Sequence, residues 1–156
     1  MVKIAKVDFY QLSPNTNQHE RNLFLCKLIE KVYLRKHKLY IHCQDQQEAN
    51  QIDELLWTYK DTSFIPHNLL GEGPSEAPPV QLGFDKTPTH NDVLINLATE
   101  IPEFHTRFKR ILEIAINSDD VSDTASHQEH LIYYQQQNFD ISTHTINQEK
   151  KAHSHG

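Results

Sequence analysis

Apolar and polar positions recur along this chain with two periods, one typical of strands and the other of helices. Residues 4–12 are β-branched and aromatic, which predicts a first strand. Asn17, followed three residues later by Glu20, matches the capping box that opens a helix. Apolar residues then recur at helical spacing to about residue 36, and residues 39–43 form a short apolar strand. The first part of the chain therefore predicts a strand–helix–strand unit.

The next segment repeats the helix-start signal. Asp45 with Glu48 predicts a second helix. Its buried face would consist of Ala49, Ile52 and Leu56, with Trp57 as a further candidate. Short connections between alternating strands and helices favour right-handed crossovers and parallel pairing. We therefore expect an α/β fold with a mainly parallel sheet and an antiparallel edge.

The rest of the chain continues the alternation after a proline-rich linker over residues 71–79. The elements expected there are strands over 80–84, 92–97, 110–116 and 139–143, a short helix opening at 102–104, and a last helix from Ser118 or Asp119 to about Gln137. Residues 147–156 are polar and of low complexity, which predicts a disordered tail. The expected domain therefore spans residues 1–146.

Residues 53–74 gather large apolar side chains outside any helical period. The segment holds the chain's single tryptophan and ends in glycine and proline; its apolar members are Trp57, Phe64, Ile65, Pro66 and Leu69. Large apolar groups in irregular structure favour a docking surface. The alternative is that Trp57 and Phe64 complete the core.

Length and charge limit the choice of function. A chain of 156 residues suits one domain with a core that needs no disulfides. The net charge is −6, from 15 basic and 21 acidic residues, and such a surface repels phosphate. The basic runs at 35–38 and 109–110 are short, and we interpret them as solvated element ends. Direct contact with DNA is not expected.

The compartment follows from the cysteines and the amino terminus. Cys26 and Cys43 lie inside apolar runs, which favours buried thiols in a reducing compartment over a disulfide. The first eight residues meet a charge before any apolar stretch forms, so no signal peptide is predicted, and no run approaches the roughly 18 apolar residues of a membrane span. We expect a soluble, cytoplasmic protein without membrane contact.

Nucleotide binding requires backbone N–H groups at close approach, which glycine-rich turns provide. The turn after the first strand, residues 13–17, contains no glycine, and no Walker-type motif is present. In the segment 71–74 (GEGP), Glu72 has the wrong charge for phosphate and Pro74 removes a donor. The sequence therefore predicts an α/β fold without a nucleotide site.

Metal and catalytic signatures are equally weak. The eleven histidines are scattered, and His127 with His130, although spaced i,i+3, are better explained as surface residues of a polar helix. We expect no metal and no cofactor. Gly-x-Ser-x-Gly is absent. The alternative that stays open is a small α/β hydrolase or nucleotide-processing enzyme built on Asp8, Asp92 and His67.

Several motifs resemble the chi subunit of bacterial DNA polymerase III, a clamp-loader accessory protein. The resemblance rests on Leu55-Leu56-Trp57, on residues 63–69 (SFIPHNL) and on residues 71–74 (GEGP). It continues through residues 9–12, 79–80 and 92–97 and Phe104, and more loosely through Tyr134, residues 138–139 and Thr143, so that it covers about residues 1–146. The central segment is specific enough to identify the family.

The resemblance implies a Rossmann-like, three-layer α/β/α domain without a nucleotide site or intrinsic catalysis. It also implies two protein contacts that link the replicase to coated single-stranded DNA. One binds the psi subunit of the clamp loader, and in some relatives a helicase uses the same surface. The psi or helicase surface would consist of Trp57, Phe64, Ile65, Pro66, His67 and Leu69.

The second implied contact takes the acidic C-terminal tail of single-stranded DNA-binding protein. Relatives commonly carry basic residues on the last helix, but residues 128–135 contain no Arg or Lys. His130 could supply a charge at low pH, and Lys109 or Arg110 could replace the missing charges. The implied surface is Lys109, Arg110, Gln128, His130, Leu131, Ile132, Tyr134 and Thr143. We expect weak or relocated tail binding with reduced salt dependence.

Overall fold

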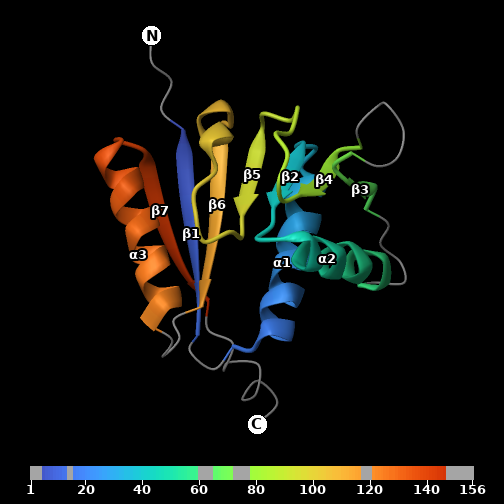
Figure 1. Cartoon of the computed structure of the whole chain (residues 1–156), viewed down its shortest axis with the longest axis horizontal. Coiled ribbons are helices and arrows are strands. Elements are labelled where there is room, and N and C mark those ends of the chain that lie inside the picture. The colour runs from blue at the N-terminus through green and yellow to red at the C-terminus, as the bar shows by residue number, and fades with distance from the viewer. Residues whose placement is uncertain (1–4, 14–15, 60–64, 72–77, 117–120, 147–156) are drawn as a thin grey trace.

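The computed structural model describes residues 5–13, 16–59, 65–71, 78–116 and 121–146. Strands and helices alternate through most of this part of the chain (Figure 1). The elements are β1 Lys6–Leu12, α1 Gln18–Leu34, β2 Leu39–His42, α2 Gln46–Thr58, β3 His67–Leu69, β4 Val80–Gly83, β5 Val93–Asn96, the 3₁₀ helix η1 Glu103–Arg107, β6 Arg110–Ile116, α3 Val121–Gln136 and β7 Asp140–Ile146. The residues expected to form a tail, 147–156, lie outside the described residues.

The described strands form one seven-stranded sheet in the order β3-β4-β2-β5-β6-β1-β7. Every pairing between neighbours is parallel, so the expectation of an antiparallel edge is wrong. At one edge the reason is helix α3, which carries the chain from the end of β6 back to the start of β7. Strand β7 therefore runs beside β1 in the same direction, with Lys6 opposite Asp140 and Leu12 opposite Ile146.

Strand β3, at the other edge, was not expected from the sequence. It has only three residues, His67–Leu69, which is too short for an alternation of polar and apolar positions to be recognised. The strand is defined by its pairing with β4, in which His67 lies opposite Val80 and Leu69 opposite Leu82. Part of the expected irregular docking segment is therefore an edge strand.

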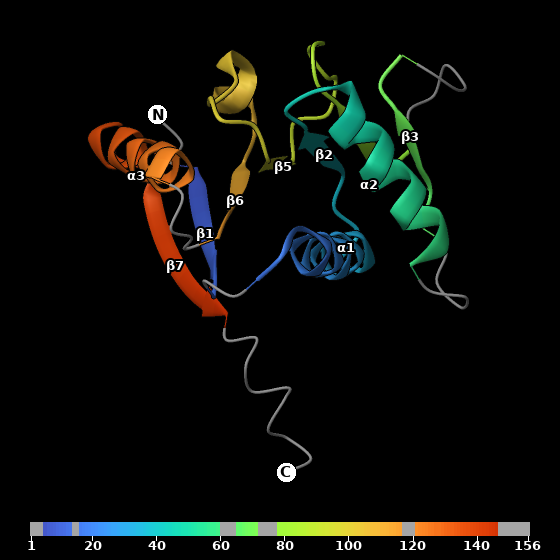
Figure 2. The same ribbon diagram turned by 60° about the horizontal axis from the view of Figure 1, so that its bottom comes forward.

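Alternate residues of each strand point to opposite faces of the sheet, and each face has its own core. Leu39 and Ile41 of β2 pack in one cluster with apolar residues of α1 and α2. Tyr40, between them, packs in the second cluster with Tyr134 of α3 and Phe108, which follows η1. Helices α1 and α3 accordingly lie on opposite sides of the sheet (Figure 2). This is the expected Rossmann-like, three-layer α/β/α arrangement.

The helix starts follow the sequence signals closely. Asn17 accepts a hydrogen bond from the Glu20 backbone N–H at 2.8 Å, and the Glu20 carboxylate accepts one from the Asn17 N–H at 3.0 Å, which confirms the capping box. Asp45 caps α2 by accepting from the Glu48 N–H at 2.9 Å. Helices α1 and α3 are each followed by a residue in the left-handed region, Lys36 at φ 67° and Asn138 at φ 63°.

Both cysteines are buried free thiols, as the sequence predicts. Cys26 of α1 and Cys43, after β2, belong to the same core cluster. Burial raises the pKa of Cys26 to about 12, and burial is also the main reason that the pKa of Cys43 is raised. Both are therefore neutral packing residues at physiological pH.

Candidate protein-binding surfaces

Trp57 lies on the surface, in the last turn of α2. Its side chain is 55% exposed, whereas Leu56 beside it is buried in the core. The indole packs against the imidazole of His67 with ring centroids 4.6 Å apart. Of the two interpretations of Trp57, the structure supports a surface role. Phe64, which was paired with it in both interpretations, lies outside the described residues.

The strand under this indole is held by His67, a buried residue. Its Nδ1 lies 2.6 Å from the carbonyl oxygen of Ile65, and its Nε2 lies 3.2 Å from Asp53 Oδ1 and from the Asp53 carbonyl oxygen. Ile65 is buried in the core, and Pro66 and Leu69 are half-buried. We refer to Trp57, Pro66, His67 and Leu69 as the tryptophan surface. In it one large exposed ring rests on an edge strand fixed to α2.

The inner side of α3 is held to the sheet by a buried carboxylate, Glu113 of β6. Tyr134 donates a hydrogen bond to Glu113 Oε2 at 2.8 Å, and Asn96 Nδ2 donates to the same oxygen at 3.1 Å. His130 Nδ1 lies 3.0 Å from Glu113 Oε1, and its Nε2 lies 2.8 Å from the carbonyl oxygen of Thr99. Glu113 and its partners Tyr134, Asn96 and His130 are buried.

His130 is placed as an imidazolium. Both of its ring nitrogens face acceptors, and only the protonated ring can donate from both. Burial alone would lower the pKa of His130, but the hydrogen bond and charge of Glu113 and the Thr99 carbonyl outweigh it and raise that pKa. The charge is directed at Glu113 rather than at solvent. His130 therefore connects α3, β6 and the segment after β5.

The residues expected to receive an acidic tail fall into two groups. Tyr134 and His130 point into the Glu113 network, and Leu131 is half-buried. In contrast, Gln128, Ile132 and Thr143 are exposed, and the exposed fraction of Ile132 is 51%. The exposed described residues of α3 include no Lys or Arg and do include Glu129. The outer face of α3 is thus polar and lacks basic groups in its described part.

Arg110 does not join this helix. Its Nε lies 2.6 Å from Asp8 Oδ2, and Asp8 is also 2.9 Å from His144 Nε2. These side chains alternate with Val7 and Ile111, which pack in the α3-side cluster, so they point to the opposite face of the sheet. Lys109 is exposed at the amino end of β6. Lys109 and Arg110 therefore do not supply the basic charges that α3 lacks.

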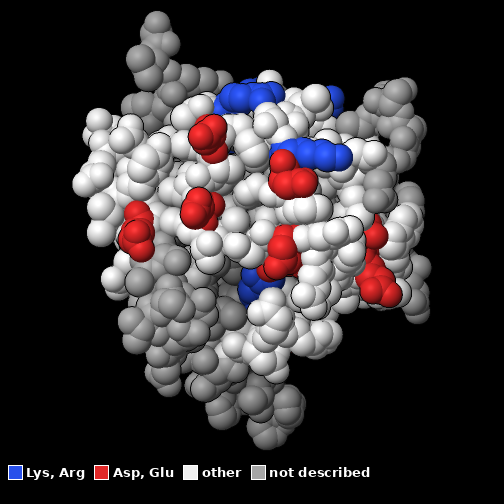
Figure 3. All heavy atoms as spheres, viewed as in Figure 1, with Lys and Arg blue, Asp and Glu red and all other residues white. Residues whose placement is uncertain are grey.

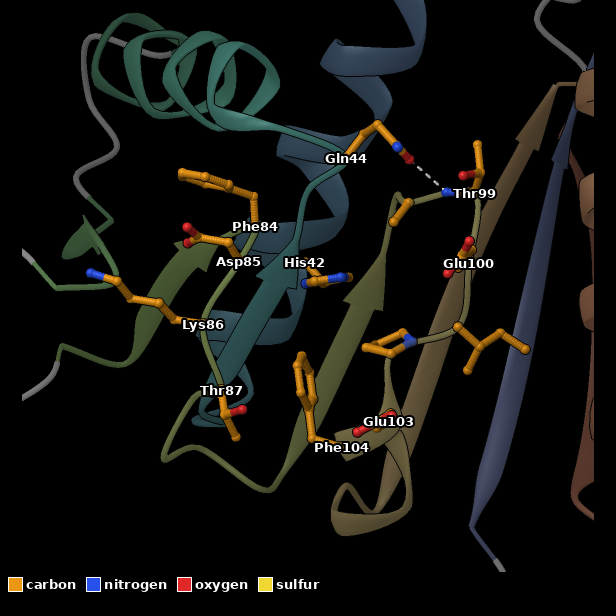
Figure 4. Close-up of a pocket in the computed structure, with 13 residues that line it drawn as sticks. His42, Gln44, Phe84, Asp85, Lys86, Thr87, Thr99, Glu100, Glu103 and Phe104 are labelled. Atoms are coloured by element: carbon orange, nitrogen blue, oxygen red, sulfur yellow. Dashed lines mark hydrogen bonds between the residues drawn. The ribbon is translucent and has the colours of Figure 1, made fainter.

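A cleft of about 690 Å³ opens at the carboxyl ends of β2, β4 and β5 (Figure 4). Helix α2 follows β2 on one face of the sheet and η1 follows β5 on the other, so the cleft lies at a switch point, where α/β proteins commonly bind ligands. Its rim is fixed by Gln44, which accepts from the Thr99 N–H at 2.7 Å. Burial lowers the pKa of His42 in the lining, although Glu48 opposes the shift.

The lining of this cleft is more acidic than basic. Its ionisable side chains other than His42 are Asp85, Lys86, Glu100 and Glu103. Lys86 points away from the cleft centre in Figure 4, and its Nζ lies beside Gly71. Three carboxylates at the lining oppose a phosphate ligand. The cleft was not anticipated from the sequence, because its residues come from three separate loops.

The three residues of the hydrolase alternative are not brought together. His67 belongs to β3 and Asp8 to β1, which are five strand steps apart in the sheet, or roughly 24 Å at about 4.8 Å a step. Asp92 lies before β5, where it accepts from the Lys38 N–H at 3.1 Å and pairs with His37 at 3.0 Å. Each of the three thus belongs to a separate local pairing, and they form no common acid–base set.

Within the described ranges, no group of three or more His, Cys, Asp or Glu side chains is placed to hold a metal ion. The rings of His127 and His130 lie 6.4 Å apart between centroids and nearly perpendicular. No helix in this part of the chain is long and apolar enough to cross a membrane. On the face shown in Figure 3, acidic side chains are scattered, and basic ones lie at the upper margin and also further down beside acidic ones.

The fold and these surfaces define a Rossmann-like α/β protein with an exposed tryptophan at the end of α2, packed against an edge strand, and a polar last helix. The crystal structure of T4 UvsW shares the fold, with a TM-score of 0.64 at 10% identity, over 93% of this chain and 42% of that one. A family model described as "DNA polymerase III chi subunit, HolC" matches residues 4–142, and the chain belongs to this family. Its members are accessory subunits of DNA polymerase III, which assigns the chain to DNA replication.

Curated relatives agree with the family model. DNA polymerase III subunit chi of Pseudomonas aeruginosa is 32% identical over 144 residues, which cover 92% of this chain and 98% of the relative. The subunits of the same name from Escherichia coli K12 and Haemophilus influenzae are 29% and 31% identical and cover 78% and 76% of this chain. Each relative is matched over at least 82% of its own length.

Proposed function

We propose that this chain is a non-catalytic, cytoplasmic adaptor of the DNA polymerase III holoenzyme and that its tryptophan surface binds the psi subunit. The observation that supports this most directly is the 55% exposure of Trp57. A tryptophan that is exposed in the free protein and becomes buried in a complex is the side chain most often found to dominate binding energy. Family membership supplies the class of partner, and the exposed ring supplies the anchor.

The support beneath Trp57 adds to this argument. His67, which contacts the indole, is held by hydrogen bonds to Ile65 and Asp53, so the surface is fixed before the partner arrives. A preformed surface loses less side-chain freedom on binding and gains affinity. A helicase that shares the psi-type surface would therefore compete with psi for the same tryptophan.

The test is a calorimetric titration of purified psi into wild-type and Trp57→Ala protein. We expect the variant to bind about 30-fold more weakly or worse, which corresponds to roughly 2 kcal/mol for a central aromatic anchor. Leu34→Ala is the matched control, because Leu34 is also a large apolar residue, 68% exposed, at the end of a helix. Equal psi affinity of the two variants would place the contact elsewhere.

We infer for the second contact that the tail of single-stranded DNA-binding protein binds α3 weakly. The exposed Ile132 and Gln128 offer apolar and polar contacts, whereas Glu129 repels an acidic peptide and Arg110 points to the other face of the sheet. A labelled tail peptide titrated at low and high salt should bind weakly, with an affinity that changes little. Tight binding that salt abolishes would contradict this inference.

A further inference from the structure

The two short basic runs of the sequence are brought together by the parallel sheet. Strands β2, β5, β6 and β1 are neighbours, and all begin at the same edge. The Val93 N–H donates to the Lys38 carbonyl at 3.1 Å, the Lys109 N–H to the Asp92 carbonyl at 3.0 Å, and the Lys6 N–H to the Lys109 carbonyl at 3.3 Å. The backbones of Lys38, Lys109 and Lys6 therefore stand in one row along the strand starts. In the pleat, Lys38 and Lys109 share the α3 side with Tyr40 and Ile111, whereas Lys6 shares the other side with Leu12.

The row spans three strand steps, or roughly 14 Å at about 4.8 Å a step. We define the amino edge as this row, Lys6, Lys38 and Lys109, together with Arg35 and Lys36, which follow α1; all five residues are exposed. In Figure 3 basic side chains lie at the upper margin, where the strands of Figure 1 begin, with acidic side chains below them. A chain with a net charge of −6 thus has a local basic surface.

The acidic neighbours of the amino edge only partly offset this charge. Asp92, at the start of β5, is bound to the Lys38 N–H and to His37, and only a quarter of its side chain is exposed. Asp140, opposite Lys6 in β7, is the other carboxylate among the described strand starts. The short helix η1, at the same end of the sheet (Figure 1), adds the exposed Glu103 and the exposed Arg107, whose charges offset each other. The five cations therefore outnumber the carboxylates, and the edge stays positive at neutral pH.

The shape of the amino edge favours a flexible anion over a rigid one. The described strand starts form a row, and the 3₁₀ helix η1 beside them has only five residues. Neither offers the α-helix that a duplex groove would take. Leu34, 68% exposed, lies next to Arg35 and offers an apolar contact to an unstacked base. An acidic peptide with an apolar end would need a pocket, and the cleft described above opens at the carboxyl ends of β2, β4 and β5 and is lined by carboxylates that repel such a peptide.

We infer that the amino edge binds the phosphate backbone of single-stranded nucleic acid, in addition to the protein contacts proposed above. Four phosphate contacts to a single strand predict a slope of about −3 in a plot of log K against log salt. The affinity is expected in the non-specific range, with Kd on the order of 10⁻⁵ M at physiological salt and tighter binding at low salt. Such a contact suits a transient hold on a strand rather than a sequence-specific complex.

The test measures the fluorescence anisotropy of a labelled oligothymidylate of about 20 nucleotides at several salt concentrations. Lys38→Glu/Lys109→Glu should bind at least about tenfold more weakly than wild type. Lys86→Glu, which reverses one charge at the cleft, should bind as wild type does. Asp140→Lys, which extends the row by one strand, should bind more tightly.

Each remaining outcome overturns the inference. The first is that the wild type does not bind the oligonucleotide at low salt, and the second is that Lys86→Glu loses as much affinity as the double variant. The third is that the wild type prefers a duplex of the same length. The fourth is that an acidic peptide displaces the labelled oligonucleotide at a lower concentration than unlabelled oligonucleotide does. Lys38→Gln/Lys109→Gln repeats the test without placing a new carboxylate beside Asp92. Its far-ultraviolet circular dichroism must match that of wild type before binding is compared.

Discussion

Glu113 and His130 form an ion pair at 3.0 Å between β6 and α3, with both side chains less than a tenth exposed. A buried pair of this kind is costly to break, because the remaining partner is left charged without its neighbour. Here the carboxylate also accepts from Tyr134 and Asn96, and the imidazolium reaches Thr99. The position of the last helix therefore depends on one buried charge.

Replacement of His130 by alanine should lower the free energy of unfolding by about 3 kcal/mol, the range found when one partner of a buried pair is removed. Urea denaturation at neutral pH measures the change. Gln128→Ala, an exposed substitution on the same helix, should change stability by no more than about 0.5 kcal/mol. A loss in His130→Ala as small as that of Gln128→Ala would show that the pair contributes little.

The pair should also make stability depend on pH. The pKa of His130 is raised in the folded state above its ordinary 6.5. The folded protein therefore binds the imidazole proton more tightly than the unfolded chain does. The stabilisation is complete below pH 6.5 and is lost as the pH rises through the raised folded-state pKa. Unfolding midpoints measured across this window should fall for wild type more steeply than for His130→Ala. Parallel pH profiles would contradict the assignment.

Lys36→Gly should stabilise the protein. Lys36 has φ 67° just after α1, where its N–H donates to the Tyr33 carbonyl and the next N–H donates to the Val32 carbonyl. The left-handed conformation costs a residue with a Cβ about 1 kcal/mol, and glycine adopts it freely. Thermal unfolding should show a gain of that order. Lys38→Gly, two residues further on at the start of β2, should instead be neutral or destabilising.

Gly83→Ala should destabilise the sheet through Tyr40. A Cβ at Gly83, the last residue of β4, would meet the Tyr40 hydroxyl and also approach the Cβ of Leu70. Overpacking of this kind costs roughly 1–3 kcal/mol. Because the closest atom is the hydroxyl oxygen, Tyr40→Phe/Gly83→Ala should recover part of the loss. A double-mutant cycle in urea with no coupling between the two positions would exclude the clash as the cause.

The sequence predicts most elements of this fold because their signals are local. The capping box at Asn17 and the helical spacing of Ala49, Ile52 and Leu56 depend only on neighbouring residues. Trp57 is adjacent to Leu56 in sequence but about 100° round the helix from it, which turns it towards solvent. Strand β3 and the wholly parallel sheet were missed because they depend on pairing between distant segments.

The candidate surfaces show the same limit. Glu113 interrupts an apolar strand, and a lone carboxylate there was a signal for a buried pair that sequence reasoning did not use. His130 was expected to face solvent, because its partner is seventeen residues away on a strand. Lys38 and Lys109 are far apart in sequence, so the basic row exists only once β5 and β6 pair.

A sheet in which every described strand runs the same way gives the molecule two chemically different poles. Cations gather at one pole, and at the other opens a cleft lined by Asp85 and Glu100. Such a molecule carries an electric dipole, and the electric field of a polyanion would orient it before contact. It would approach a polyanion with its strand starts leading, which leaves the cleft turned outward.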